Sequence, residues 1–193
     1  MFEYITGEIT EITPTFVVLE TQGVAFYIQI SLNTYSELSK VKNSKVFIHQ
    51  VIRDDAHLLY GFSGKHEREM FRFLISVSGI GASSARMILS ALTPGDLRES
   101  IVQGNVAALK AIKGIGAKTA QRLIVDLRDK VGKVTGEGGF LNISGNTIRE
   151  ESLSALATLG FSKSAVLKVV DDLISKNPEI GVESLLREAL KRL

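Results

Sequence analysis

A nine-residue segment occurs twice in the middle of this chain: residues 77–85 are VSGIGASSA and residues 112–120 are IKGIGAKTA. Each copy places an apolar residue before a Gly-Ile-Gly turn and a helix start with alanines after it. Paired glycines allow the backbone angles that end one helix and begin another after a sharp turn. The isoleucine between them is expected to pack the two helices together. The repeat therefore predicts two helix–hairpin–helix units.

A helix start of this kind leaves backbone N–H groups without partners and so forms a natural anion site. Two such sites in tandem predict a surface that binds DNA phosphates without reading bases. The predicted contacts are the turns Gly79, Ile80, Gly81 and Gly114, Ile115, Gly116, the hydroxyls of Ser83, Ser84 and Thr119, and the cations Lys113, Lys118 and Arg122.

Other glycine motifs fit the two segments poorly. A dinucleotide fingerprint needs a third glycine, but Ser84 and Thr119 occupy that place. Residues 116–119 are GAKT, in which the glycine and the lysine are not adjacent as a P-loop requires. The remaining alternative is a pair of structural helix corners without a ligand. The duplication, with three cations around the second copy, favours phosphate binding.

Composition and charge narrow the class of protein. The chain has 193 residues, 45% of them hydrophobic and 23% charged, as in soluble globular proteins. It has no cysteine, which excludes disulfides, thiol catalysis and cysteine-bound zinc. No export signal or membrane-length apolar stretch is visible, so we expect a cytoplasmic protein. Residues 1–63 hold 4 basic and 7 acidic side chains, whereas residues 64–130 hold 11 and 6. The basic excess coincides with the hairpins, as polyanion binding requires.

The first 62 residues show the alternating pattern of short strands separated by turn residues. The clearest strand segments are 16–19, 24–30, 45–52 and 57–62, with one short helix at 31–39. About five short strands in so few residues predict a small closed barrel of the OB-fold type. We interpret its aromatic residues Phe16, Phe26, Tyr27 and Phe47 as core, because they alternate with Val and Ile. This disfavours a single-strand-binding scaffold, which would need exposed stacking rings.

The rest of the chain is predicted to be helical, so the fold class is α+β with several domains. We expect the barrel at 1–63, a tandem helix–hairpin–helix domain at 64–131, a flexible glycine-rich linker at 132–146 and a three-helix module at 147–193. The helices of the last module are expected at 147–158, 162–175 and 181–192.

No catalytic constellation is visible. His49, His57 and His66 lack partners at metal-ligand or triad spacing. Asp54 and Asp55 could hold Mg²⁺ in a nuclease, but no third acidic ligand is recognisable near them. We therefore predict no intrinsic active site, no metal and no cofactor. A structure-specific nuclease remains the alternative from the enzyme class, and a single-strand-binding scaffold the alternative from the binding class.

The order of these parts resembles the RuvA family of Holliday-junction branch-migration proteins. Besides the two hairpins, the matching stretches are MF at 1–2, RDDAHLLYGF at 53–62, ALATLGF at 155–161 and LREAL at 186–190. The resemblance covers the whole chain and implies a homotetramer, formed through the barrel domain, that holds a four-way junction open and flat. It leaves open whether one tetramer or two facing tetramers enclose the DNA.

The resemblance also implies partners and site residues. The last module would recruit the hexameric ATPase RuvB, the motor of a helicase complex acting in recombination, repair and the SOS response. A resolvase of the RuvC type is a further implied partner. Asp54 and Asp55, by themselves an ordinary polar turn, would form an acidic pin at the junction centre. Leu156, Leu159 and Leu190 would form an apolar patch for RuvB, although in so small a bundle they could instead be core.

Overall fold

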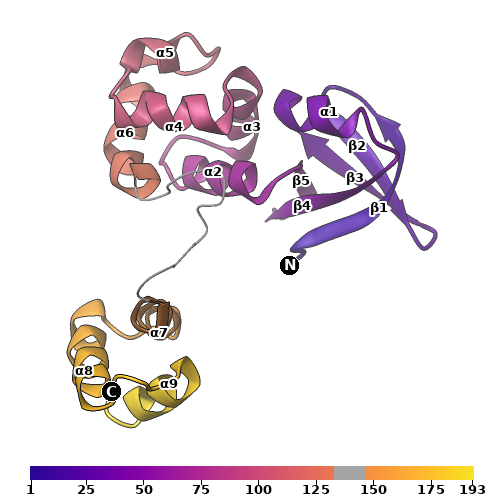
Figure 1. Cartoon of the computed structure of the whole chain (residues 1–193). Coiled ribbons are helices and arrows are strands. Elements are labelled where there is room, and N and C mark those ends of the chain that lie inside the picture. The colour runs from indigo at the N-terminus through magenta and orange to yellow at the C-terminus, as the bar shows by residue number, and fades with distance from the viewer. Residues whose placement is uncertain (133–146) are drawn as a thin grey trace. The chain divides into compact units, whose positions relative to one another are not determined.

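The computed structural model describes residues 1–132 and 147–193 and divides the chain into two compact units, residues 1–137 and 138–193 (Figure 1). The linker predicted at 132–146 lies, from residue 133 on, outside the described residues. Within the described ranges, no helix is long and apolar enough to cross a membrane.

The first unit opens with a closed five-stranded barrel, which confirms the predicted fold. Its strands are β1 (Tyr4–Ile12), β2 (Phe16–Thr21), β3 (Val24–Ile30), β4 (Asn43–Ile52) and β5 (His57–Phe62), in the barrel order β1-β2-β3-β5-β4. Helix α1 (Leu32–Leu38) connects β3 to β4. Alternate residues point inward, as the period of two requires. The buried centre therefore consists of branched side chains, among them Val17, Leu19, Ile28, Val46 and Ile48.

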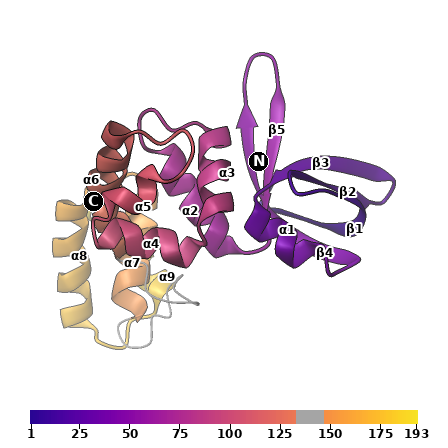
Figure 2. The same ribbon diagram turned by 90° about the horizontal axis from the view of Figure 1, so that it is seen from above.

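The β4–β5 hairpin extends beyond the barrel wall. These strands pair from Phe47–Phe62 out to Ile52–His57. By contrast, β5 pairs with β3 only at Gln29–Tyr60 and Ile30–Gly61. The outer half of the hairpin therefore stands clear as a two-stranded arm, which Figure 2 shows projecting from the barrel.

Five helices form the second half of this unit: α2 (Lys65–Ile75), α3 (Ala82–Ala91), α4 (Pro94–Val102), α5 (Val106–Lys110) and α6 (Ala117–Gly132). Pro94 occupies the first turn of α4, where its missing N–H costs nothing, and Thr93 caps this helix through the Asp96 amide. The helices share one core with the outer face of β5, where Tyr60 and Phe62 pack on Phe71.

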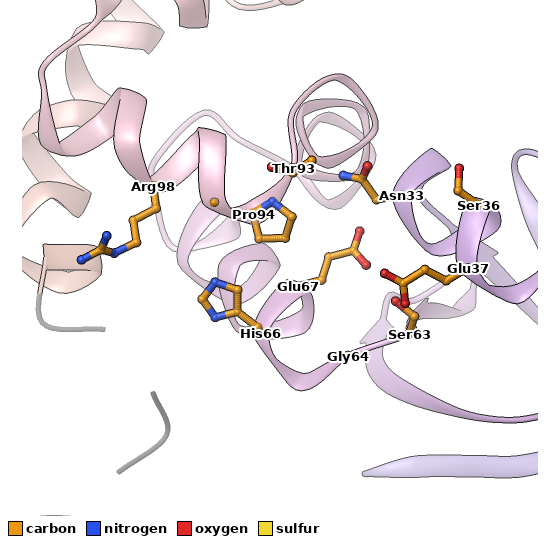
Figure 3. Close-up of a pocket in the computed structure, with 11 residues that line it drawn as sticks. Asn33, Ser36, Glu37, Ser63, Gly64, His66, Glu67, Thr93, Pro94 and Arg98 are labelled. Atoms are coloured by element: carbon orange, nitrogen blue, oxygen red, sulfur yellow. The ribbon is translucent and has the colours of Figure 1, made fainter. Parts of the chain in front are cut away.

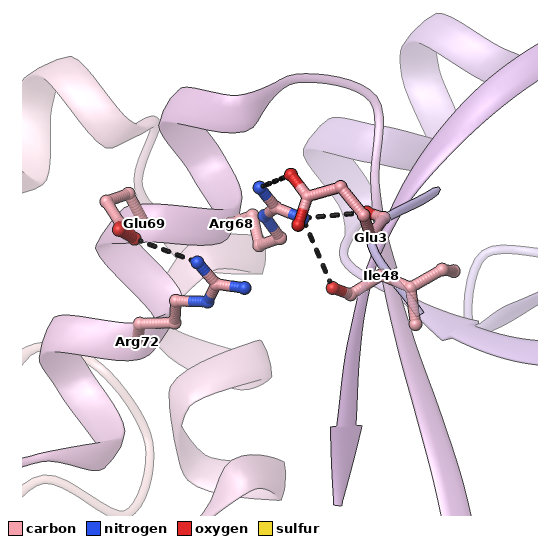
Figure 4. A network of polar contacts seen from close by, with 5 residues as sticks. All are labelled: Glu3, Ile48, Arg68, Glu69 and Arg72. Carbon is pink, nitrogen blue, oxygen red and sulfur yellow. Dashed lines mark hydrogen bonds and ion pairs between the residues drawn. The ribbon is translucent and has the colours of Figure 1, made fainter. Parts of the chain in front are cut away.

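Polar contacts join the barrel to the helices as well. The buried Arg68 of α2 forms an ion pair of 2.6 Å with Glu3 and donates to the carbonyl oxygens of Glu3 and Ile48 (Figure 4). The hydrogen bond from Arg68 lowers the pKa of the Glu3 carboxyl. The Asn33 amide of α1 donates to the Leu89 and Leu92 carbonyls at the end of α3. The barrel thus holds the helices that carry the hairpins.

The second unit consists of α7 (Thr147–Thr158), α8 (Lys163–Lys176) and α9 (Val182–Leu190). Its core includes Leu156, Val166, Val170, Leu185 and Ala189. Helix α7 ends at Thr158, and the chain then turns at Gly160, whose φ of +97° suits glycine. The Phe161 amide closes this turn by donating to the Leu156 carbonyl.

Candidate nucleic-acid interface

The two hairpins have the same backbone geometry. In the first, the Ile80 amide donates to the Val77 carbonyl at 3.0 Å, and in the second the Ile115 amide donates to Ile112 at 3.1 Å. Both isoleucines are buried, at 5% and 7% exposure. They therefore hold the helices together, as the sequence predicted, and their side chains are not available to a ligand.

The glycines divide into two pairs with different tasks. Gly79 and Gly114 have φ of +91° and +89°, a region that other residues enter only at a cost. Gly81 and Gly116 lie directly before α3 and α6, and their carbonyls accept the first helical hydrogen bonds. A methyl group built on any of the four would meet no atom within 4 Å. The backbone is thus open on this side, as close approach of a phosphate requires.

The amides of these four glycines have no acceptor among the residues that the structure describes. Each of the two hairpins therefore presents free backbone N–H groups where its second helix begins. Because N–H groups at a helix start carry partial positive charge, an anion is favoured there.

The side chains predicted around the turns are available to solvent. Lys113, Lys118 and Arg122 are exposed, as is Ser83, while Ser84 and Thr119 are half-buried. Arg122 also donates from Nη1 to the Ser78 carbonyl at 3.2 Å. It thereby links the helix of the second hairpin to the turn of the first. This contact, which the sequence did not reveal, brings the two hairpins together on one side of the helical domain.

Asp54 and Asp55 lie at the tip of the β4–β5 arm. Both are exposed, and the turn closes through the Arg53 amide, which donates to the Ala56 carbonyl at 2.9 Å. No described group of three or more acidic or histidine side chains is arranged to hold a metal ion. The arm therefore carries two carboxylates away from the barrel without a counterion from the described chain.

One expectation about the barrel is wrong. Tyr27 was interpreted as core, but it is 58% exposed, and Phe16 and Phe47 are only partly buried. Phe16 and Tyr27 stack with ring centroids 4.6 Å apart. The alternation was correct in period, but Phe16, Tyr27 and Phe47 lie on the outer side of the sheet. Phe26 shares the inward face of β3 with Ile28 and packs against the barrel core, as expected. Aromatic and aliphatic residues both suit an outer strand face, so sequence pattern alone did not separate the two sides.

A hollow lies between the barrel and the helices, at the starts of α2 and α4 (Figure 3). It has a volume of about 880 Å³ and its lining includes Asn33, Glu37, His66 and Arg98. Glu67 beside it is buried and accepts hydrogen bonds from Ser31 and Thr34. Burial raises the pKa of this carboxyl. Its hydrogen bonds join α2 to the start of α1, so it is part of the domain joint.

Comparison with known proteins identifies the family. The model of the RuvA N-terminal domain matches residues 1–61, that of the SAM-like helix-hairpin-helix tandem residues 71–129, and that of the RuvA C-terminal domain residues 147–193. The chain belongs to the RuvA family. Relatives named "Holliday junction branch migration complex subunit RuvA" match it over their whole length and its own. They are 47% identical in Christiangramia forsetii, 46% in Bacteroides thetaiotaomicron and 43% in Flavobacterium psychrophilum.

The structure corrects one residue of the patch expected from the RuvA resemblance. Leu156 is fully buried in the core of the three-helix unit, whereas Leu159 is 61% and Leu190 46% exposed. The three-residue spacing predicted that Leu156 and Leu159 share a helix face, but Leu159 lies in the turn that follows α7. Leu156 is thus a core residue, and only Leu159 and Leu190 of the expected patch are exposed.

Proposed function

We propose that this chain is the non-catalytic junction-binding subunit of a branch migration complex. The observation that carries the proposal is the pair of equivalent hairpins, which share one core and present free glycine amides, in one unit with an arm that carries Asp54 and Asp55. The names of the full-length relatives support the same function.

The hairpins act as phosphate clamps. The amides of Gly81 and Gly116 donate to phosphate oxygens, and Lys113 and Lys118 neutralise charge beside them. Because phosphates carry no base information, binding is independent of sequence and falls steeply with salt. Selectivity for a junction must then come from the spacing of several clamps.

Assembly of several copies of the chain sets the spacing between the phosphate clamps. In a homotetramer the β4–β5 hairpins of the four chains meet at one centre, and the carboxylates of Asp54 and Asp55 form the acidic pin. Like charge repels phosphates, so an ordinary duplex is kept out of the centre while the open crossover is tolerated. The clamps therefore attract the four DNA duplexes of the junction, and the pin keeps the centre of the junction open.

The C-terminal unit serves as the attachment point for the motor. Leu159 and Leu190 expose apolar surface on a small bundle whose core is already complete without them. We propose that this surface docks on the ATPase RuvB. The junction-binding subunit itself then needs no nucleotide site, and RuvC-type resolvase access to the held junction is compatible with this arrangement.

The test uses the full chain with a labelled four-way junction, a duplex of equal length and a single strand of equal length. We expect the junction to be bound most tightly, the preference to persist in different sequences, and light scattering to give a tetramer. Equal affinity for junction and duplex would refute the proposal. Tightest binding to the single strand would favour the scaffold alternative, and cleavage of the junction in Mg²⁺ would favour the nuclease.

A further inference from the structure

The barrel carries an exposed pair of stacked aromatic rings that the phosphate clamps and the acidic pin do not use. Phe16 of β2 and Tyr27 of β3 have ring centroids 4.6 Å apart at an interplanar angle of 28°. We call this pair the aromatic platform. Tyr27 is 58% exposed, which leaves much of its ring open to solvent. A preformed stack with a free ring is suited to receive another flat ring.

The platform lies on the outer face of the barrel, next to the helical domain. Tyr60 faces outward, because its ring contacts Phe71 of α2. Gln29 pairs with Tyr60, so Tyr27, two residues earlier on the same strand, shares this face. In addition, Arg86 of α3 donates to the Thr15 carbonyl at 2.9 Å, directly before Phe16. The platform is therefore beside α3, the helix that the first hairpin begins.

The same position is close to the base of the pin. Gln29 pairs with Tyr60 at the base of the arm, and Tyr27 lies two residues before Gln29 on β3. Beyond this pair β5 no longer pairs with β3, and Asp55 is five residues from Tyr60, roughly 17 Å along an extended strand. On the other side, Gly81 is five residues before Arg86, about 7.5 Å along the helix axis. The platform thus lies beside the helix that the first phosphate clamp begins and near the base of the arm that carries the pin.

Charge decides which part of a nucleic acid fits there. Glu20 follows Phe16 and Val18 on the same face of β2, and Glu11 pairs with Val18 from β1. Two carboxylates near the rings oppose a phosphate but do not oppose an uncharged base. Every base has a π-face that stacks on an aromatic side chain, whatever the sequence.

We propose that Phe16 and Tyr27 form a stacking site for an unpaired nucleobase at the crossover of a bound junction. The inference rests on the proposed function, because only an open crossover supplies unpaired bases beside the pin. The clamps then hold the backbone, the pin keeps strands apart, and the platform receives a base that has left its partner. A base is thereby held transiently while it waits to pair with a new strand.

The experiment places 2-aminopurine, an adenine analogue whose emission falls on stacking, at the crossover or in the middle of one arm. The full chain, Tyr27→Ala, Tyr27→Phe and Val24→Ala are compared, the last removing an exposed aliphatic side chain from the same strand. We expect crossover emission on binding to be higher for Tyr27→Ala than for the wild type. Junction affinity should fall roughly fivefold or more, with an unchanged salt slope. Tyr27→Phe and Val24→Ala should behave as the wild type, and the arm probe should not respond.

Unchanged crossover emission and affinity in Tyr27→Ala would overturn the stacking site while leaving junction binding intact. A smaller particle mass for Tyr27→Ala in light scattering would show that the rings contact a second copy of the chain, which also overturns it. If the wild type did not prefer the junction over the duplex, the proposed function itself would fail, and the stacking site with it.

Discussion

The two pairs of hairpin glycines give a sharp prediction, because their backbone angles differ. Gly79 and Gly114 have φ near +90°, so alanine there must adopt a left-handed conformation that costs about 1–2 kcal/mol of folding free energy. Gly81 and Gly116 lie outside that region, and a methyl group on either has open space. Alanine is a poorer helix cap than glycine, but it also lowers the entropy of the unfolded chain, and the two effects nearly cancel.

DNA binding should rank the variants differently from stability. Alanine at Gly81 or Gly116 should weaken junction binding although it leaves the stability of the fold nearly unchanged. In Gly81→Ala and Gly116→Ala the chain keeps its fold, but the methyl group occupies space that a phosphate needs to reach the amide. A hydrogen bond to a charged group contributes about 1.5–3 kcal/mol, so loss of one per hairpin weakens junction binding by roughly 10- to 150-fold. The assay is titration of a labelled junction at fixed salt, with urea unfolding of each variant as the control. Wild-type affinity in a folded Gly116→Ala would refute the clamp and leave the glycines as helix punctuation.

Further predictions concern the pin, the C-terminal unit and the domain joint. Replacing Asp54 and Asp55 by Asn should preserve or strengthen DNA binding and reduce the preference for junction over duplex in competition titrations; a simple fall in affinity would contradict the pin. Leu156→Ala should destabilise the C-terminal unit by about 2–5 kcal/mol in urea unfolding, whereas Leu159→Ala should leave its stability nearly unchanged and reduce stimulation of the RuvB ATPase. Glu67 has a raised pKa in the folded chain, so its contribution to stability is largest below the ordinary carboxyl pKa and is lost as pH rises through the folded value. Unfolding free energies measured from pH 4 upward should therefore decline more steeply for the wild type than for Glu67→Gln, and parallel curves would contradict this assignment.

The sequence by itself determined the parts and their order. Glycine pairs and capping residues act locally, so the repeat at 77–85 and 112–120 was enough to predict both hairpins and the helices that flank them. Alternation with a period of two was enough to predict strands β2, β3, β4 and β5, because that period follows from the backbone alone, whereas β1 (Tyr4–Ile12) was not given bounds. The basic excess around the hairpins and the exposed Asp54 and Asp55 turn likewise needed only the order of residues.

Only the tertiary structure decided which side of an element is inside. Leu156 and Leu159 have the same side chain three residues apart, yet one is core and the other is exposed, because Leu156 packs with α8 and α9 whereas Leu159 lies in the turn after α7. Tyr27 alternates like a core residue but faces outward, since the closure of the barrel selects one face of β3 for burial. The contact of Arg122 with Ser78 joins residues far apart in sequence. Such contacts depend on how whole elements pack, and no local pattern of residues encodes that packing.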